Sequence, residues 1–223
     1  MELNEGLEVL GTDEYVPDGA MREGVFEKSA LEHIKLPSTL KRIEYSAFQE
    51  CGNLRNIELP DGLMTIGKLC FFKSGLEKIV FPPSVKQVGA HAFQDCVKLR
   101  LATLNEGLRA LGPQEAGGGD VFEGWVFARS GLEAIKLPST LAVVPQGTFY
   151  QCRSLKTLET PEGLRTVCGY AFAGCGLQGL ALPSSLDEVR ACAFLDNPLG
   201  KVGLAGGARL RRVGSYAFGR CEL

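Results

Sequence analysis

The heptapeptide IKLPSTL occupies residues 34–40 and returns unchanged at residues 135–141. Around it, residues 3–100 align with residues 104–201 without a gap, and 38 of the 98 aligned positions are identical. Self-similarity of this extent indicates that a block of the chain was copied in tandem.

Each block is itself built from units of about 23 residues. The unit reads L-x-x-I-x-L-P-x-x-L-x-x-I-x-x-x-A-F-x-x-C, and successive prolines such as Pro37, Pro60 and Pro82 lie 23 and 22 residues apart. About nine units can be counted by their phenylalanines, which are Phe26, Phe48, Phe71, Phe93, Phe127, Phe149, Phe172, Phe194 and Phe218.

The unit predicts a short strand followed by a turn. Apolar and variable residues alternate in L-x-x-I-x-L, which is typical of a strand, and the proline that follows cannot donate a ladder hydrogen bond. A lone unit has too few apolar residues to offset the cost of ordering its backbone, whereas stacked units share their faces. We therefore predict a mainly β repeat solenoid with one parallel strand per unit and little helix.

We assign the whole chain, residues 1–223, to a single solenoid made of the blocks 3–103 and 104–223. Units one and five each hold about eleven extra residues, in the segments 11–24 and 112–125. Insertions in a solenoid map to loops on one face and often bind ligands.

The unit LPSTLKRIEYSAFQECGNLRNIEL at residues 36–59 resembles the leucine-rich repeats of the bacterial surface protein BspA and its relatives. The shared features are the proline after the strand, the A-F pair and a Cys or small residue three positions later. The resemblance covers essentially the whole chain. It implies a curved solenoid with parallel strands on its concave side, a binding role, and no catalytic residues. The chain departs from this family in its two insertions and in lacking a visible secretion signal.

Composition excludes several classes of function. The formal charge of −2 and the pI near 5.8 argue against a nucleic-acid partner. No apolar run approaches the roughly 20 residues that span a bilayer, so we expect no membrane insertion. The first residues, MELNEGLEVLG, show no signal peptide.

Five cysteines share one slot of the unit, three residues after the phenylalanine: Cys51, Cys96, Cys152, Cys175 and Cys221. Equivalent side chains of adjacent units point in parallel, which suits a disulfide poorly, and no C-x-x-C pair suggests a metal site. We interpret them as small, buried, reduced side chains, which favours an intracellular, reducing compartment. The cell surface is the alternative if the chain is a fragment without its signal.

No catalytic arrangement stands out. The two histidines, His33 and His91, do not recur in the repeat, and no nucleophile–base pair, metal cluster or phosphate-binding loop is visible. We therefore predict that the protein is not an enzyme and uses no cofactor, metal or small-molecule substrate.

Side chains that flank the inward-facing strand residues should point outward, because successive side chains of a strand alternate. The alternative to a binding role for this row is an ordinary solvated sheet face. On the concave face we predict a binding row made of His33, Lys35, Asn56, Glu58, Lys78, Val80, Leu101, Thr103, Lys136, Thr157 and Glu159.

The second insertion adds two aromatic candidates, Phe122 and Trp125, because aromatic residues at loop tips are enriched in binding hot spots. Trp125 is the only tryptophan, and the alternative is that it covers the adjacent coil. A polysaccharide ligand would call for an aromatic row on one face, and the concave row shows none.

The leading hypothesis is a non-catalytic scaffold that binds another protein or multiprotein complex through its concave face and inserted loops. Neither end shows a polar capping repeat, so the chain is either a fragment or a subunit whose ends are covered. A structural subunit embedded in a large assembly through its uncapped ends, and a cell-surface adhesion module, are the alternatives.

Overall fold

The computed structural model describes residues 1–11, 24–112, 124–206 and 210–223. Its regular elements are strands, and no residue in these ranges belongs to an α-helix. The strands are β1 (Val9–Leu10), β2 (Arg42–Ile43), β3 (Thr65–Ile66), β4 (Lys78–Val80), β5 (Gln87–Val88), β6 (Leu101–Thr103), β7 (Ala110–Leu111), β8 (Ala134–Lys136), β9 (Val143–Val144), β10 (Thr157–Glu159), β11 (Thr166–Val167), β12 (Gly179–Leu182), β13 (Glu188–Val189), β14 (Lys201–Leu204) and β15 (Arg212–Val213).

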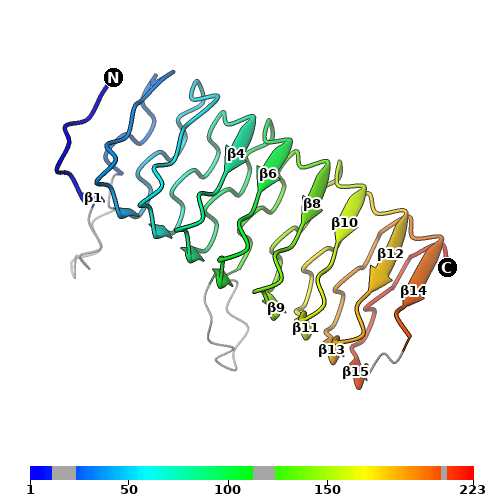
Figure 1. Ribbon diagram of the computed structural model, residues 1–223. Coiled ribbons are helices and arrows are strands. Elements are labelled where there is room, and N and C mark those ends of the chain that lie inside the picture. The colour runs from blue at the N-terminus through cyan, green and yellow to red at the C-terminus, as the bar shows by residue number, and fades with distance from the viewer. Residues whose placement is uncertain (12–23, 113–123, 207–209) are drawn as a thin grey trace, which may run out of the picture.

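The coils stack along one axis from the N-terminus to the C-terminus (Figure 1). A row of longer strands pairs in the orders β10-β8-β6-β4 and β12-β14. A second row of two-residue strands pairs in the orders β1-β2-β3-β5-β7 and β15-β13-β11-β9. Every pairing is parallel, as in β8 with β10, where Ala134 faces Thr157. The predicted parallel β solenoid is confirmed.

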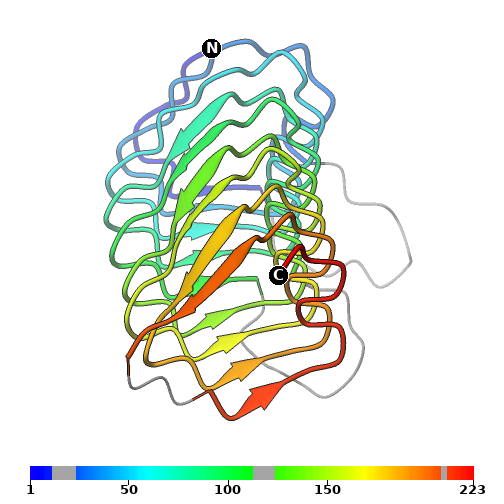
Figure 2. The ribbon, with the colours of Figure 1, turned by 90° about the vertical axis from the view of Figure 1, so that its right-hand side faces the viewer.

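Figure 2 looks along the stack and shows the two rows of strands on two sides of the coil, with turns on the third. These turns also form a ladder. In one coil the backbone N–H groups of Leu69, Phe71 and Lys73 donate to the carbonyls of Ala90, Ala92 and Gln94 at 3.0, 2.8 and 2.9 Å. The turn side is therefore bonded from coil to coil, like a strand row.

This turn requires left-handed backbone on both sides of each phenylalanine. Among the described residues, all fifteen non-glycine residues with positive φ lie two positions before or two positions after a repeat phenylalanine, as Leu69 and Lys73 do beside Phe71. Such backbone costs about 1–2 kcal/mol per residue. It is tolerated because the flanking N–H groups make the inter-coil bonds just described.

The repeat phenylalanines form one column through the core. All nine rings stack, with centroids of neighbouring rings 5.1–5.5 Å apart and ring planes within 18° of parallel. The seven inner rings from Phe48 to Phe194 are fully buried. The column joins apolar residues of both blocks into one hydrophobic cluster that reaches from Leu10 to Ala217.

The slot three residues after the phenylalanine always holds a hydrogen-bonding side chain. The thiol of Cys96 donates to the carbonyl of Phe71 at 2.9 Å, and that of Cys152 donates to the carbonyl of Phe127 at 3.0 Å. Asn197 replaces the cysteine in one unit and its amide donates to the Phe172 carbonyl at 2.8 Å. All eight cysteines are free, as predicted. The five in this slot act as donors, however, and not only as small apolar groups.

Stacking predicts a specific energetic difference between two neighbouring phenylalanines. Phe71 is fully buried between Phe48 and Phe93, whereas Phe72 is only partly buried. Because Phe71→Ala leaves a cavity inside the column, we expect it to lower the free energy of unfolding by about 3–5 kcal/mol in urea denaturation. Phe72→Ala is the matched control and should cost less than half as much. Equal losses for the two variants would contradict a stability that depends on the column.

The thiols give a pH dependence with a defined sign. Burial raises the pKa of Cys96 to about 12 and that of Cys152 to about 11, from an ordinary value of 9.0. The folded chain thus keeps protons that the unfolded chain releases, so these thiols make stability fall as the pH rises above 9.

We expect the Cys96→Ser, Cys152→Ser double variant to lose less stability between pH 9 and pH 11 than the parent chain. Serine fits the slot, since Ser74 and Ser130 occupy it in other units. Urea denaturation at a series of pH values measures the difference. Parallel pH profiles would show that these thiols do not titrate as described.

Candidate interaction face

The long-strand face is the set of outward side chains on β4, β6, β8, β10, β12, β14 and the equivalent segments 33–35 and 56–58. Its strands alternate exposed, buried, exposed, as in β8 and β10. All eleven residues predicted for the binding row are exposed on this face: His33, Lys35, Asn56, Glu58, Lys78, Val80, Leu101, Thr103, Lys136, Thr157 and Glu159. Their binding role stays a prediction.

The middle of this face is apolar. Val80 and Leu101 are 55% and 51% exposed, and Leu101 lies opposite Lys78 in the pairing of β4 with β6. At the N-terminal end, Lys35 forms an ion pair with Glu2 at 2.6 Å, which raises the pKa of the lysine. The face is therefore charged at its N-terminal end and exposes apolar side chains near its middle.

A groove with a volume of about 630 Å³ lies at the N-terminal end of the long-strand face. Four residues of the predicted row, His33, Lys35, Asn56 and Glu58, line it. Its apolar lining includes Ile34, Leu36, Ile57, Leu59 and Pro60. The structure thus brings the first four predicted residues together, while Lys136, Thr157 and Glu159 lie several coils away.

Sequence reasoning missed two carboxylates of this groove, Glu5 and Asp61. Both stand one position after the proline slot of their units, which the search for outward strand residues did not reach. The signal was present, because an acidic residue recurs in this slot at Glu106 and Glu162.

In three of these four units the carboxylate binds a serine of the next coil. Glu5 accepts hydrogen bonds from the Ser38 backbone N–H and hydroxyl at 3.2 and 2.9 Å. Glu106 does the same with Ser139. Hydrogen bonding to the serine lowers the pKa of both carboxyl groups, so they are ionised at neutral pH. Glu162 binds the corresponding serine of its own neighbour.

Trp125 covers the adjacent coil. A Cβ added at Gly147 would lie 2.5 Å from the indole ring, and the ring meets the edge of Tyr150 at a centroid distance of 4.8 Å. This packing agrees with the alternative we gave for Trp125. Phe122 and the rest of both insertions, residues 12–23 and 113–123, lie outside the described residues.

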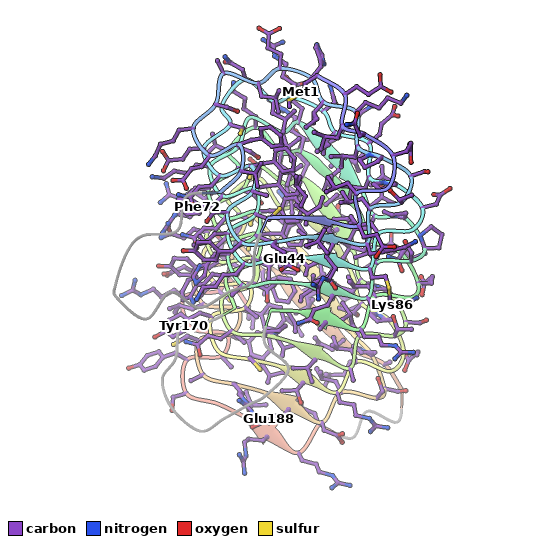
Figure 3. All side chains as sticks on the ribbon, turned by 90° about the vertical axis from the view of Figure 1, so that its left-hand side faces the viewer. Met1, Glu44, Phe72, Lys86, Tyr170 and Glu188 are labelled. Atoms are coloured by element: carbon purple, nitrogen blue, oxygen red, sulfur yellow. The ribbon has the colours of Figure 1, made fainter. Side chains whose placement is uncertain are left out.

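Aromatic residues do gather, but on the turn side. Tyr150 lies 6.4 Å from Tyr170 between ring centroids. Figure 3 shows Tyr170 and Phe72 projecting on the same side of the stack, away from Lys86. Trp125 and Tyr150 meet edge to face, as do Tyr150 and Tyr170, so each of these rings covers part of its neighbour.

The histidines do not share a site. His33 lies in the groove, whereas His91 lies in a turn, where its Nδ1 atom contacts the side-chain oxygen of Gln94. Within the described ranges, no group of three or more His, Cys, Asp or Glu side chains is placed to hold a metal ion. No helix in those ranges is long and apolar enough to cross a bilayer.

Residues 20–115 and 122–223 match the family described as BspA type leucine rich repeat region (6 copies). The chain belongs to the BspA-type leucine-rich repeat family. The resemblance inferred from the repeat unit is thereby confirmed.

Solved structures of leucine-rich repeat proteins are similar to this chain. One from Bacteroides ovatus has a TM-score of 0.70 and 21% identity, over 97% of this chain and 63% of its own. The T. pallidum leucine rich repeat protein has a TM-score of 0.54 and 30% identity, over 71% of this chain and 72% of its own. A leucine rich cell surface protein from Faecalibacterium prausnitzii has a TM-score of 0.55 and 21% identity, over 94% of this chain and 62% of its own.

The chain spans less than two thirds of the length of the B. ovatus and F. prausnitzii proteins. No curated protein matches it.

Proposed function

We propose that this BspA-type chain is a non-catalytic interaction module that binds a partner protein or multiprotein complex through its long-strand face. The observation that carries the proposal is the groove, which gathers His33, Lys35, Asn56 and Glu58 on one outward surface. Beyond the groove, Val80 and Leu101 give the same face an exposed apolar centre. Apolar centres with polar surroundings are typical of protein interfaces.

The rigidity of the coil supports this role. Each outward side chain of β4 and β6 stands on a strand whose middle residue, Ile79 or Ala102, is buried in the core. A face fixed in this way presents its side chains with little loss of conformational freedom on binding, which favours affinity.

The location follows the comparison and not the cysteines. The similar F. prausnitzii protein is described as a cell surface protein, which supports the surface alternative. No comparison supports the intracellular compartment that we predicted from the free thiols.

Cross-linking tests the proposal. The chain is captured with its partner from extracts of its own cells, and a lysine-reactive reagent is followed by mass spectrometry. We expect inter-protein cross-links at Lys35, Lys78 and Lys136, and loss of capture with Lys78→Glu, because a reversed charge at an interface repels the partner. Lys68→Glu, on the turn side, is the matched control and should capture the partner normally.

Two results would contradict the proposal. Cross-links confined to Lys201 and the terminal coils, with a constant set of co-purified proteins, would indicate the structural subunit. Equal loss of capture in both variants would show that the long-strand face has no special role.

A further inference from the structure

The groove exists where the long-strand row is open. Residues 33–35 and 56–58 of the first block correspond to β8 and β10 of the second block, which pair over three residues. In the first block the same segments do not pair with each other as strands. Lys35 instead forms an isolated parallel β-bridge with Glu2. The two blocks therefore differ in strand pairing at these matched segments.

The segment of residues 56–59 has unused backbone groups. None of its N–H groups donates a hydrogen bond to any residue that the structure describes, and the neighbouring bond runs from the Glu77 N–H to the Arg55 carbonyl at 2.9 Å. Its side chains still alternate, with Ile57 buried between the exposed Asn56 and Glu58.

Asp61 differs from its three equivalents for a reason visible in the sequence. Glu162 binds Ser184 of the next coil, and the residue in the place of that serine is Pro83. Proline has neither a backbone N–H nor a hydroxyl group, so it cannot donate the two hydrogen bonds that serine donates to the carboxylate of the neighbouring coil, here called the serine cap. Asp61 is also one methylene shorter than glutamate. Within the described chain it makes no hydrogen bond or ion pair through its carboxylate.

The charge of the groove follows from these contacts. Lys35 is paired with Glu2, and the carboxylate of Glu5 is held by Ser38. Glu58 and Asp61 remain without a cationic partner among the described residues, beside the apolar side chains of the lining. An arginine or lysine fits such a lining, because its aliphatic stem packs on apolar surface while its charged end reaches carboxylates.

We propose, resting on the function proposed above, that the groove binds an extended segment of a partner protein that presents arginine or lysine side chains to Glu58 and Asp61. The apolar lining accommodates the stems of these side chains. The second block carries the same acidic positions, Glu159 and Glu162, but its strands are paired and Glu162 is capped.

The experiment uses the full chain and two labelled probes. One is an end-capped peptide of alternating arginine and valine, and the other has glutamate in place of arginine. Fluorescence anisotropy at physiological salt should show binding of the arginine peptide alone. The Glu58→Gln, Asp61→Asn variant should lower its affinity about tenfold, whereas Glu106→Gln, Glu162→Gln, which removes two serine-bound carboxylates outside the binding row, should leave the affinity unchanged.

A second variant keeps the negative charge at residue 61 and restores the hydrogen bonds between serine and carboxylate. Asp61→Glu together with Pro83→Ser recreates the arrangement of Glu162 and Ser184. We expect this variant to be at least as stable as the parent and to bind the arginine peptide about tenfold more weakly, since its carboxylate is occupied. Circular dichroism and urea denaturation confirm that each variant is folded.

Absence of binding to the arginine peptide, equal effects of the two charge-removing pairs, or full binding by the capped variant would each overturn the groove proposal. The outcome is separable from that of the cross-linking test. If the arginine peptide does not bind but cross-links fall at Lys78 and Lys136, the groove proposal is wrong and the proposed function stands. If the peptide binds but the cross-links fall elsewhere, the proposed role of the wider long-strand face is wrong.

Discussion

Everything in this structure depends on hydrogen bonds that run from one coil to the next. A coil of about 23 residues cannot satisfy its own backbone groups, because its strands are two to four residues long. Parallel pairing satisfies them on two sides of the coil, and the bonds from Leu69, Phe71 and Lys73 satisfy them on the third. Side chains with the same periodicity then stack in columns, of which the phenylalanine column is the largest.

The sequence was sufficient to predict the repeat, the parallel strands, the buried phenylalanines and the outward-facing row of the long-strand face. Each of these follows from a periodic pattern of apolar residues. It did not reveal the left-handed positions. Ser46, Leu69, His91 and Tyr170 share one such slot and have nothing in common as residue types. Their conformation is imposed by bonds to the next coil and not by local preference.

The role of the cysteine slot was also only partly predictable. Ser, Cys and Asn occupy it, which suggested small size, whereas the Cys and Asn side chains donate to the phenylalanine carbonyl of the preceding coil and the serine hydroxyls contact the cysteine of the next coil. The groove escaped prediction for a different reason. The uncapped carboxylate in it, Asp61, depends on an exception to the repeat, Pro83 in the place of a serine, and a consensus conceals exceptions. The duplication makes the exception visible, since Ser184 and Glu162 show the regular arrangement.

Native-state hydrogen exchange tests this account most directly, because it reads the inter-coil bonds one amide at a time. The amides of Leu69, Phe71 and Lys73, and the amides of β10 that donate to β8, should be protected. The amides of residues 56–58, which match β10 in the duplicated block, should exchange much faster. Equal protection of residues 56–58 and β10 would contradict an open ladder and the groove that depends on it.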